Sequence, residues 1–148
     1  MRIETAFYNY LSNKATVTAV VSTRIFPEVV PQELLTGRTD NYPAITYQVI
    51  SARPVNSHGG SSTMQYTRIQ TDSWARTKSA ARDLALVLYN ALHGYSGTWG
   101  GVSGVFIGSV FMEDQSDSAF ESAGSLPQRL FGVRQDWMIG HDADDPTL

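Results

Sequence analysis

The chain has 148 residues, a formal net charge of −3 and no cysteine. A single domain of this size buries roughly 70% of its unfolded surface, so its core needs neither disulfides nor a metal. The missing cysteine excludes disulfides, thiolate metal sites and cysteine nucleophiles. The negative net charge argues against a broad nucleic-acid-binding face.

The first residues predict neither a secretory signal nor a membrane anchor. Glu4, Thr5, Asn9 and Ser12 interrupt the apolar run that a signal peptide needs. No apolar stretch approaches the roughly 20 residues of a membrane span. We therefore expect a soluble protein that stays in the compartment where it is made.

The N-terminal quarter predicts two helices and a short extended piece. Apolar side chains recur at helical spacing over residues 3–13: Ile3, Ala6, Phe7, Tyr10 and Leu11. A second short helix is expected over residues 16–21, and residues 24–27 form an extended piece that a proline closes. Residues 31–42, which contain proline, glycine and aspartate, predict a loop.

The middle of the chain predicts a hairpin and then a helix. Alternating side chains predict strands over residues 44–51 and 63–75. The glycine- and serine-rich residues 53–62 predict a mobile hairpin loop. A helix is expected over residues 77–93, with Thr77 or Ser79 as N-cap and Gly94 at its C-terminal end. Its buried stripe comprises Ala81, Leu84, Ala85, Leu88 and Leu92.

The last third predicts a glycine-rich turn and two strands. The turn covers residues 97–104, and the strands cover residues 104–114 and 127–140. The first strand is apolar on both faces, with Val105, Ile107 and Phe111 on one face and Phe106, Val110 and Met112 on the other. Such a strand is central in its sheet or is covered by a partner. Residues 141–148 form an acidic tail that we expect to fray.

Taken together, these elements predict an α+β fold in a single domain over residues 1–148. We expect a mostly antiparallel sheet of about four to five strands, with two main helices packed on one face.

The sequence offers no constellation for catalysis, a cofactor or a metal. His58, His93 and His141 lie far apart and lack metal-ligand spacing. Residues 101–104 fail the spacing of a nucleophile elbow and lack the lysine of a phosphate-binding loop. We therefore expect no enzyme, no cofactor and no metal site.

Surface contacts are the other possible use of the polar residues. Nine arginines against two lysines, with seven tyrosines and three tryptophans, resemble the composition of protein interfaces, although genomic composition and an ordinary core explain them equally well. Glu113, Asp114, Asp117 and Glu121 form an acidic cluster without the spacing of a calcium loop. Asp72 is either a paired structural charge or an interface anchor. The candidate subunit or partner interface comprises Arg53, Asn56, His58, Asp72, Glu113, Asp114, Asp117 and Arg134.

Two long segments and the C-terminal tail add to this interface. Residues 32–40 and 53–63 are long loops for a small domain, so they either contact an adjacent subunit or are plain surface loops. We expect contacts over residues 53–63, over residues 113–117 and in the tail after Gly140.

Four motifs, in order, resemble those of one protein family. They are the amphipathic start with residues 17–27, the proline-initiated strand at residues 42–47, residues 66–75, and Arg134-Gln135-Asp136-Trp137. Over residues 3–139 the chain resembles the tail-completion, or tail-terminator, proteins of long-tailed bacteriophages and gene-transfer particles.

The resemblance implies a structural virion protein at the tail–head interface, assembled in the host cytoplasm. It implies a ring, usually of six subunits, that caps the tail tube, stops its polymerisation and meets the head connector. The implied partners are further copies of the chain, the tail tube protein and a head-side connector or stopper. DNA is expected to pass through without specific binding, and no membrane is involved.

The size and charge of the chain suit such a ring. A compact chain of this length is about 40 Å across, so six copies leave a hole wide enough for duplex DNA. Six copies at −3 carry a charge of −18, which suits a channel that does not hold DNA. A head-to-tail ring needs two different patches per subunit. Two alternatives remain at this point: another head–tail joining protein, such as a stopper or adaptor, and a small-molecule-binding or enzymatic α+β domain with a pocket.

Overall fold

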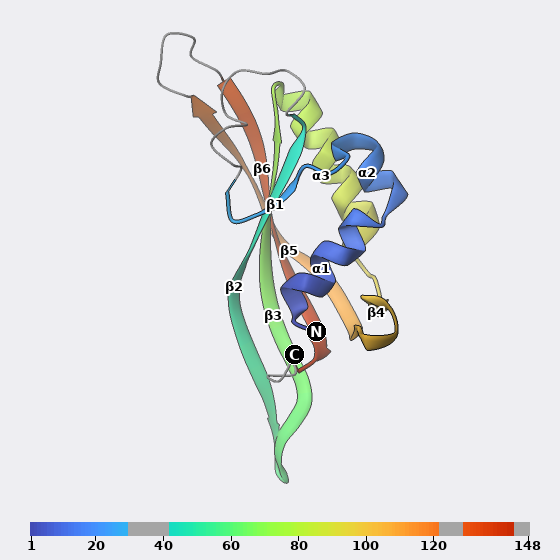
Figure 1. Cartoon of the computed structure of the whole chain (residues 1–148). Coiled ribbons are helices and arrows are strands. Elements are labelled where there is room, and N and C mark those ends of the chain that lie inside the picture. The colour runs from blue at the N-terminus through green and yellow to red at the C-terminus, as the bar shows by residue number, and fades with distance from the viewer. Residues whose placement is uncertain (30–41, 122–128, 144–148) are drawn as a thin grey trace.

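A computed structural model describes residues 1–29, 42–121 and 129–143 (Figure 1). The α-helices are α1 (Ile3–Ser12), α2 (Ala15–Val21) and α3 (Lys78–Leu92), and a short 3-10 turn, η3, covers Gly101–Ser103. The strands are β1 (Ile25–Pro27), β2 (Ala44–Ser57), β3 (Gly60–Ala75), β4 (Gly97–Trp99), β5 (Val105–Glu121) and β6 (Arg129–Asp142). No helix in these three ranges is long and apolar enough to cross a bilayer.

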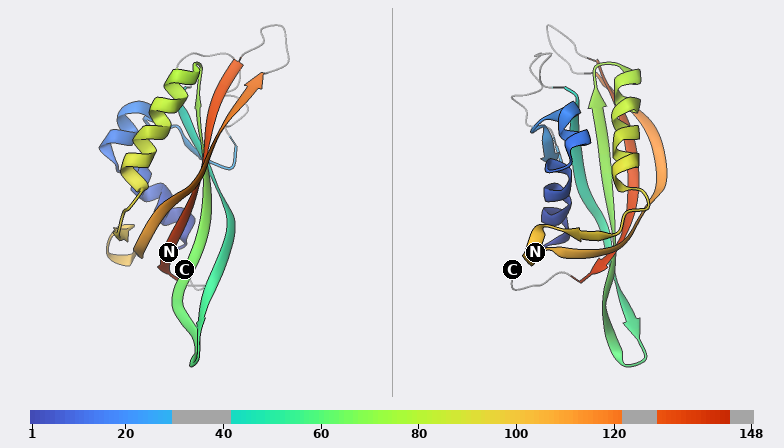
Figure 2. Two further views of the ribbon diagram at one scale, coloured as in Figure 1. Left: turned by 180° about the vertical axis from the view of Figure 1, so that it is seen from behind. Right: turned by 90° about the vertical axis from the view of Figure 1, so that its right-hand side faces the viewer.

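All six strands form one sheet in the order β1-β2-β3-β6-β5-β4. β1 runs parallel to β2, and every other neighbouring pair is antiparallel. The helices all lie on one face of the sheet, and the opposite face carries no helix (Figures 1 and 2). The β2–β3 hairpin extends well beyond the helices as a narrow arm (Figure 2).

The predicted fold class is wrong. In the described part of the chain the sheet has six strands rather than four to five, is mixed because β1 runs parallel to β2, and curls into a half-barrel; strands make up 52% of the structure, with only three α-helices. β1 lies in the extended piece predicted over residues 24–27, whereas β4, three residues long, lies in the predicted glycine-rich turn and was not predicted. Three of the four long strands, β2, β3 and β5, exceed their predicted lengths because backbone pairing continues through residues that have no apolar pattern.

The core lies between the helices and the covered face of the sheet. The predicted stripe of α3 is confirmed as buried, and that of α1 is buried at Ile3, Ala6, Phe7 and Leu11, with Tyr10 half-buried. Phe7 packs against Tyr47 and Trp99, with ring centroids 5.6 and 5.8 Å away. Trp137, Ile69 and Ile139 close the core from the strands. Burying each such large side chain contributes roughly 1.5–3 kcal/mol.

The ends of α3 follow from its local sequence. Thr77 is the N-cap, since its hydroxyl oxygen accepts a hydrogen bond from the Ala80 amide at 3.1 Å. Gly94 follows the helix with a φ of 77°, a conformation that glycine adopts without strain. Its amide donates to the Val110 carbonyl at 2.7 Å and so ties the helix end to β5.

The predicted mobile loop over residues 53–62 is wrong. β2 and β3 continue through this segment and leave only His58 and Gly59 as the turn. Gly60, with a φ of 122°, supplies the backbone conformation that the turn needs. The segment packs no core, as its composition indicates, yet it is paired strand.

The predicted faces of β5 are wrong beyond residue 107, because the strand contains a β-bulge. The register with β6 slips between Ile107 and Ser109, so the strand gains a residue at Gly108. Val110 therefore faces the core beyond Ile107, whereas Phe111 is 52% exposed. The prediction that Phe111 shares the face of Ile107 is wrong for this reason.

The prediction that residues 141–148 fray is wrong for the first two of these residues. His141 is fully buried within β6, and its imidazole lies 2.7 Å from the Thr67 hydroxyl. The strand continues to Asp142. Three segments lie outside the described residues. They are residues 144–148, the rest of the predicted tail; residues 30–41, predicted as a loop from residue 31 onward; and residues 122–128.

Candidate functional site

The middle of the helix-free face carries a row of charged and amide side chains. Alternation along β3 and β6 places them there. The register sets Gln70 opposite Asp136 and Asp72 opposite Arg134. At the same level, Gln48 lies opposite Gln70 and Asp114 lies opposite Asp136.

Both arginines of this row are held by carboxylates. Arg68 donates to Asp136 at 2.8 Å and lies 3.7 Å from Glu113. The hydrogen bond to Asp136 raises the pKa of the Arg68 guanidinium, and the nearby charges of Asp136, Glu113 and Asp114 raise it further, so the group stays charged. Arg134 donates to Asp72 at 3.0 Å. The two arginines are partly exposed, whereas the Asp72 and Asp136 carboxylates are largely buried, and the pairs occupy the cationic groups.

The amides complete the row. Gln70 donates to Asp136 at 2.8 Å, and Gln48 donates to Gln70 at 3.0 Å. The row contains four carboxylates and two guanidiniums, so this part of the face has a net charge of −2. The carboxylates are Asp72, Asp136, Glu113 and Asp114.

The predicted acidic cluster is divided between the two sides of β5. Glu113 and Asp114 join the row on the helix-free face. Asp117 lies on the helix side, where it accepts from Arg82 at 2.7 Å and Lys78 at 3.2 Å. Those hydrogen bonds, the one from Arg82 above all, lower the pKa of Asp117. Asp117 thus ties β5 to the first turns of α3; the placement of the Glu121 side chain lies outside the described residues.

The other predicted interface residues lie on the arm. Arg53 and Asn56 are exposed residues of β2, and His58 stands in the turn. None of the three lies at the level of the charged row. The structure therefore brings together Asp72 with Arg134 and Glu113 with Asp114, and leaves the arm residues apart from them.

Sequence reasoning left Arg68, Gln70 and Asp136 out of the candidate interface. The signal was available, because the alternation of β3 places Arg68 and Gln70 on the face of Asp72. What the sequence does not reveal is that β6 lies beside β3, since residues 76–128 lie between the two strands.

One end of the helix-free face is aromatic. Phe106 and Phe111 are about half exposed, and Tyr66 is 44% exposed. Phe111 contacts the His93 ring at the end of α3, 5.8 Å between centroids. Phe106 and Phe111 are exposed on the strand for which the sequence predicts a covering partner. That a partner covers them stays a prediction.

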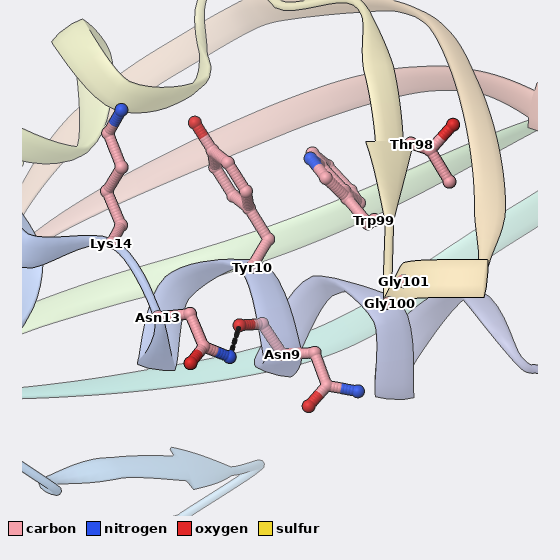
Figure 3. A pocket seen from close by; sticks show the side chains of 8 residues that line it. All are labelled: Asn9, Tyr10, Asn13, Lys14, Thr98, Trp99, Gly100 and Gly101. Carbon is pink, nitrogen blue, oxygen red and sulfur yellow. Dashed lines mark hydrogen bonds between the residues drawn. The ribbon is translucent and has the colours of Figure 1, made fainter. Parts of the chain in front are cut away.

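A groove lies between α1 and the turn after β4 (Figure 3). Tyr10 stacks on Trp99 with centroids 5.0 Å apart, and the Lys14 ammonium lies 6.0 Å from the Tyr10 ring. Burial raises the pKa of Tyr10, whose hydroxyl donates to the Ala91 carbonyl. The described lining, with a volume of about 420 Å³, contains neither a carboxylate nor a histidine: Asn9, Tyr10, Asn13, Lys14, Thr98, Trp99, Gly100 and Gly101. No group of three metal-ligating side chains gathers anywhere in the described ranges.

Comparison with known proteins finds a similar solved structure and a matching family. The fold matches a chain of a solved structure described as the virion of a native gene transfer agent particle, with a TM-score of 0.70, 13% sequence identity and 95% of each chain covered. At that identity the match shows the fold. No curated protein matches the sequence.

The profile of the family described as tail completion protein gp17 matches residues 5–120. The chain belongs to this family of structural bacteriophage tail proteins, and it is a component of the virion. The resemblance found in the sequence motifs is thereby confirmed.

Proposed function

We propose that six copies of this protein form a ring that caps the tail tube, stops its polymerisation and joins the tail to the head connector. The observation that carries the proposal is the charged row on the helix-free face, where both arginines of the row, Arg68 and Arg134, are held by carboxylates. With this face as the channel wall, the row adds −2 per subunit to the lining. Phosphate binding depends on free lysine and arginine side chains, so this wall lets DNA slide.

Family membership and the shape of the chain support the same proposal. The sheet has two different edges, β1 with the free part of β2 on one side and β4 with the free part of β5 on the other. A closed head-to-tail ring needs two such dissimilar flanks. The exposed aromatic end of the helix-free face, with Tyr66, Phe106 and Phe111, offers apolar area to an axial neighbour in the tail.

Electron microscopy of purified tail tubes, with and without the protein, tests the proposal. We expect rings at one end of each tube and tubes that no longer elongate when tube protein is added. Light scattering after size exclusion measures the mass of the free and tube-bound protein. Binding to a head connector but never to a tube would instead favour a stopper or adaptor, and a monomer that binds neither would refute the proposal.

A charge variant tests the channel wall. Asp72→Asn with Asp136→Asn releases Arg134 and Arg68, and we expect the ring to bind duplex DNA with an affinity that falls steeply with salt. The matched control is Asp83→Asn with Glu4→Gln, which makes the same charge change on α3 and α1, away from the helix-free face. Equal DNA binding by both variants would show that the helix-free face does not line the channel.

A further inference from the structure

Two strand edges are left open in the described part of the sheet. β1 covers β2 only from Ile45 to Tyr47, and the Glu28 amide adds one bond to the Tyr47 carbonyl. From residue 48 to 57, no described residue pairs with the outer edge of β2. Open edges of this length are sites where another chain adds a strand.

The second open edge belongs to β5. β4 covers its start, and the end of α3 covers the next residues through the Gly94–Val110 bond and through the Met112 amide, which donates to His93 Nδ1 at 3.1 Å. From residue 113 to 121, no described residue pairs with the outer edge of β5.

The two open edges begin at the same level of the sheet. Gln48, Gln70, Asp136 and Asp114 form one continuous cross-strand row. From this row the open part of β2 runs toward the tip of the arm, and the open part of β5 runs the opposite way. The open β2 edge of one copy can therefore lie beside the open β5 edge of a second copy only if the second copy is displaced along the strands.

The charges of the two edges are complementary. Residues 48–57 contain Arg53 and no acidic residue, whereas residues 113–121 contain four acidic residues and no basic one. Two acidic edges repel each other, so pairing of β5 with β5 is disfavoured. Val49 and Ile50, which are 41% and 47% exposed, add apolar area to the β2 edge.

We propose that the open edge of β2 in one copy pairs with the open edge of β5 in the next copy, so that one sheet continues around the ring. This inference rests on the ring of the proposed function. Three antiparallel pairings separate β2 from β5 within a copy, so the two strands run in opposite directions. Rotation about the ring axis preserves those directions, and the new pair is antiparallel.

The required displacement suits a closed sheet. If Ser51 lies beside Ser116 and Arg53 beside Asp114, then Ser51 is paired with a residue that is level with Thr46 in its own copy. Ile50 is a bulge residue, so the levels of Ser51 and Thr46, given by Arg68 and Asp72 on β3, are four residues apart. The neighbour is then shifted by four residues, or about 13 Å, across four strands that span about 19 Å. The resulting strand tilt is about 35°, which is within the range of closed β-structures.

Cysteine cross-linking tests the pairing directly, because the chain has no cysteine of its own. Ser51→Cys is combined with Ser116→Cys or with Ser118→Cys to allow for the register, and the assembled ring is oxidised in the presence of tail tubes. A disulfide needs Cβ atoms roughly 4 Å apart, so we expect a ladder of covalent multimers from one of the two combinations. Ser51→Cys with Ser79→Cys, an exposed position on α3, is the control and should give no ladder.

The outcomes separate this inference from the proposed function. A ring that caps tubes but gives no ladder with either combination refutes the edge pairing and leaves the proposed function intact. Protein that neither forms rings nor caps tubes refutes the proposed function and the pairing with it.

A charge exchange supplies an independent readout. Arg53→Glu should weaken assembly roughly tenfold, as expected for loss of a charge pair at an interface, and Asp114→Arg should act similarly. The double variant should recover to within about threefold of the parent, whereas Arg53→Lys should assemble normally. Single and double variants that weaken assembly additively, measured by light scattering across a dilution series, would overturn the pairing.

Discussion

Polar side chains are buried and hydrogen-bonded on one face of the sheet and partly exposed and ion-paired on the other. On the face beneath the helices, Trp137 donates to the Thr71 hydroxyl at 2.9 Å and Gln135 donates to the Ala85 carbonyl at 3.0 Å, all without contact with solvent. On the helix-free face, Arg68 and Arg134 remain partly exposed and are paired with carboxylates. The covered face therefore provides stability, while the open face sets what the surface repels or binds.

The largest difference between the faces should appear on truncating a core side chain. Leu88→Ala removes a fully buried side chain of α3 and should lower the free energy of unfolding by about 2–5 kcal/mol. Leu86→Ala, on the same helix but 58% exposed, should change it by less than about 0.5 kcal/mol. Urea denaturation measures both, and equal losses would contradict the assignment of the buried stripe.

A buried hydrogen bond should come next in size. Thr71→Val keeps the shape of the side chain but removes the acceptor of the Trp137 indole N–H, so it should cost about 1–3 kcal/mol. Thr71→Ser retains the oxygen and should recover most of that loss. Denaturation midpoints of the two variants give the comparison, and an unchanged midpoint for Thr71→Val would rule out the bond.

The helix cap should have a smaller effect. Thr77→Ala removes the acceptor of the Ala80 amide and should cost about 1 kcal/mol. Ser79→Ala, two residues further along in the first turn, is the matched control and should be nearly neutral. Thermal unfolding followed by circular dichroism would show whether Thr77 alone matters.

The smallest effect should come from the exposed ion pairs of Asp117. Its pKa is lowered in the folded state, so its contribution is complete above the ordinary value of 3.8 and is lost as the pH falls below that value. Asp117→Asn should therefore lower the melting temperature slightly at pH 7 and progressively less as the pH falls below 3.8, and added salt should narrow the difference. A difference that does not change with pH would mean that the side chain acts by packing rather than by charge.

The sequence predicted those parts of the fold in which a side-chain pattern and a backbone pattern coincide. The helices over residues 3–13 and 77–93 were predictable because their apolar stripes face the core. The hairpin arm was not, because residues 53–62 pair through their backbones while their side chains show no alternation. β4 is too short for any pattern, and the bulge at Gly108 reverses the alternation of β5 without a marker other than the glycine itself.

The same reasoning explains which interface residues were found. Asp72 and Arg134 could be proposed individually from their strands, but their pairing depends on the contact between β3 and β6, which is long-range. Asp117 was grouped with Glu113 and Asp114 because they are close in sequence. A strand alternates its side chains, and a second register shift lies between Met112 and Asp114, so proximity in sequence did not mean a shared face.

The register shift at Gly108 also determines where this chain can tolerate a change of length. Gly108 is the extra residue of the bulge, so deleting it would leave Ile107, Ser109 and Val110 in regular alternation opposite His141, Gly140 and Ile139, with Val110 still facing the core. An added residue in the turn at His58 and Gly59 displaces nothing beneath the helices, because the turn stands at the tip of the arm. Related chains that differ in length should therefore vary at the tip of the arm or by the bulge residue itself.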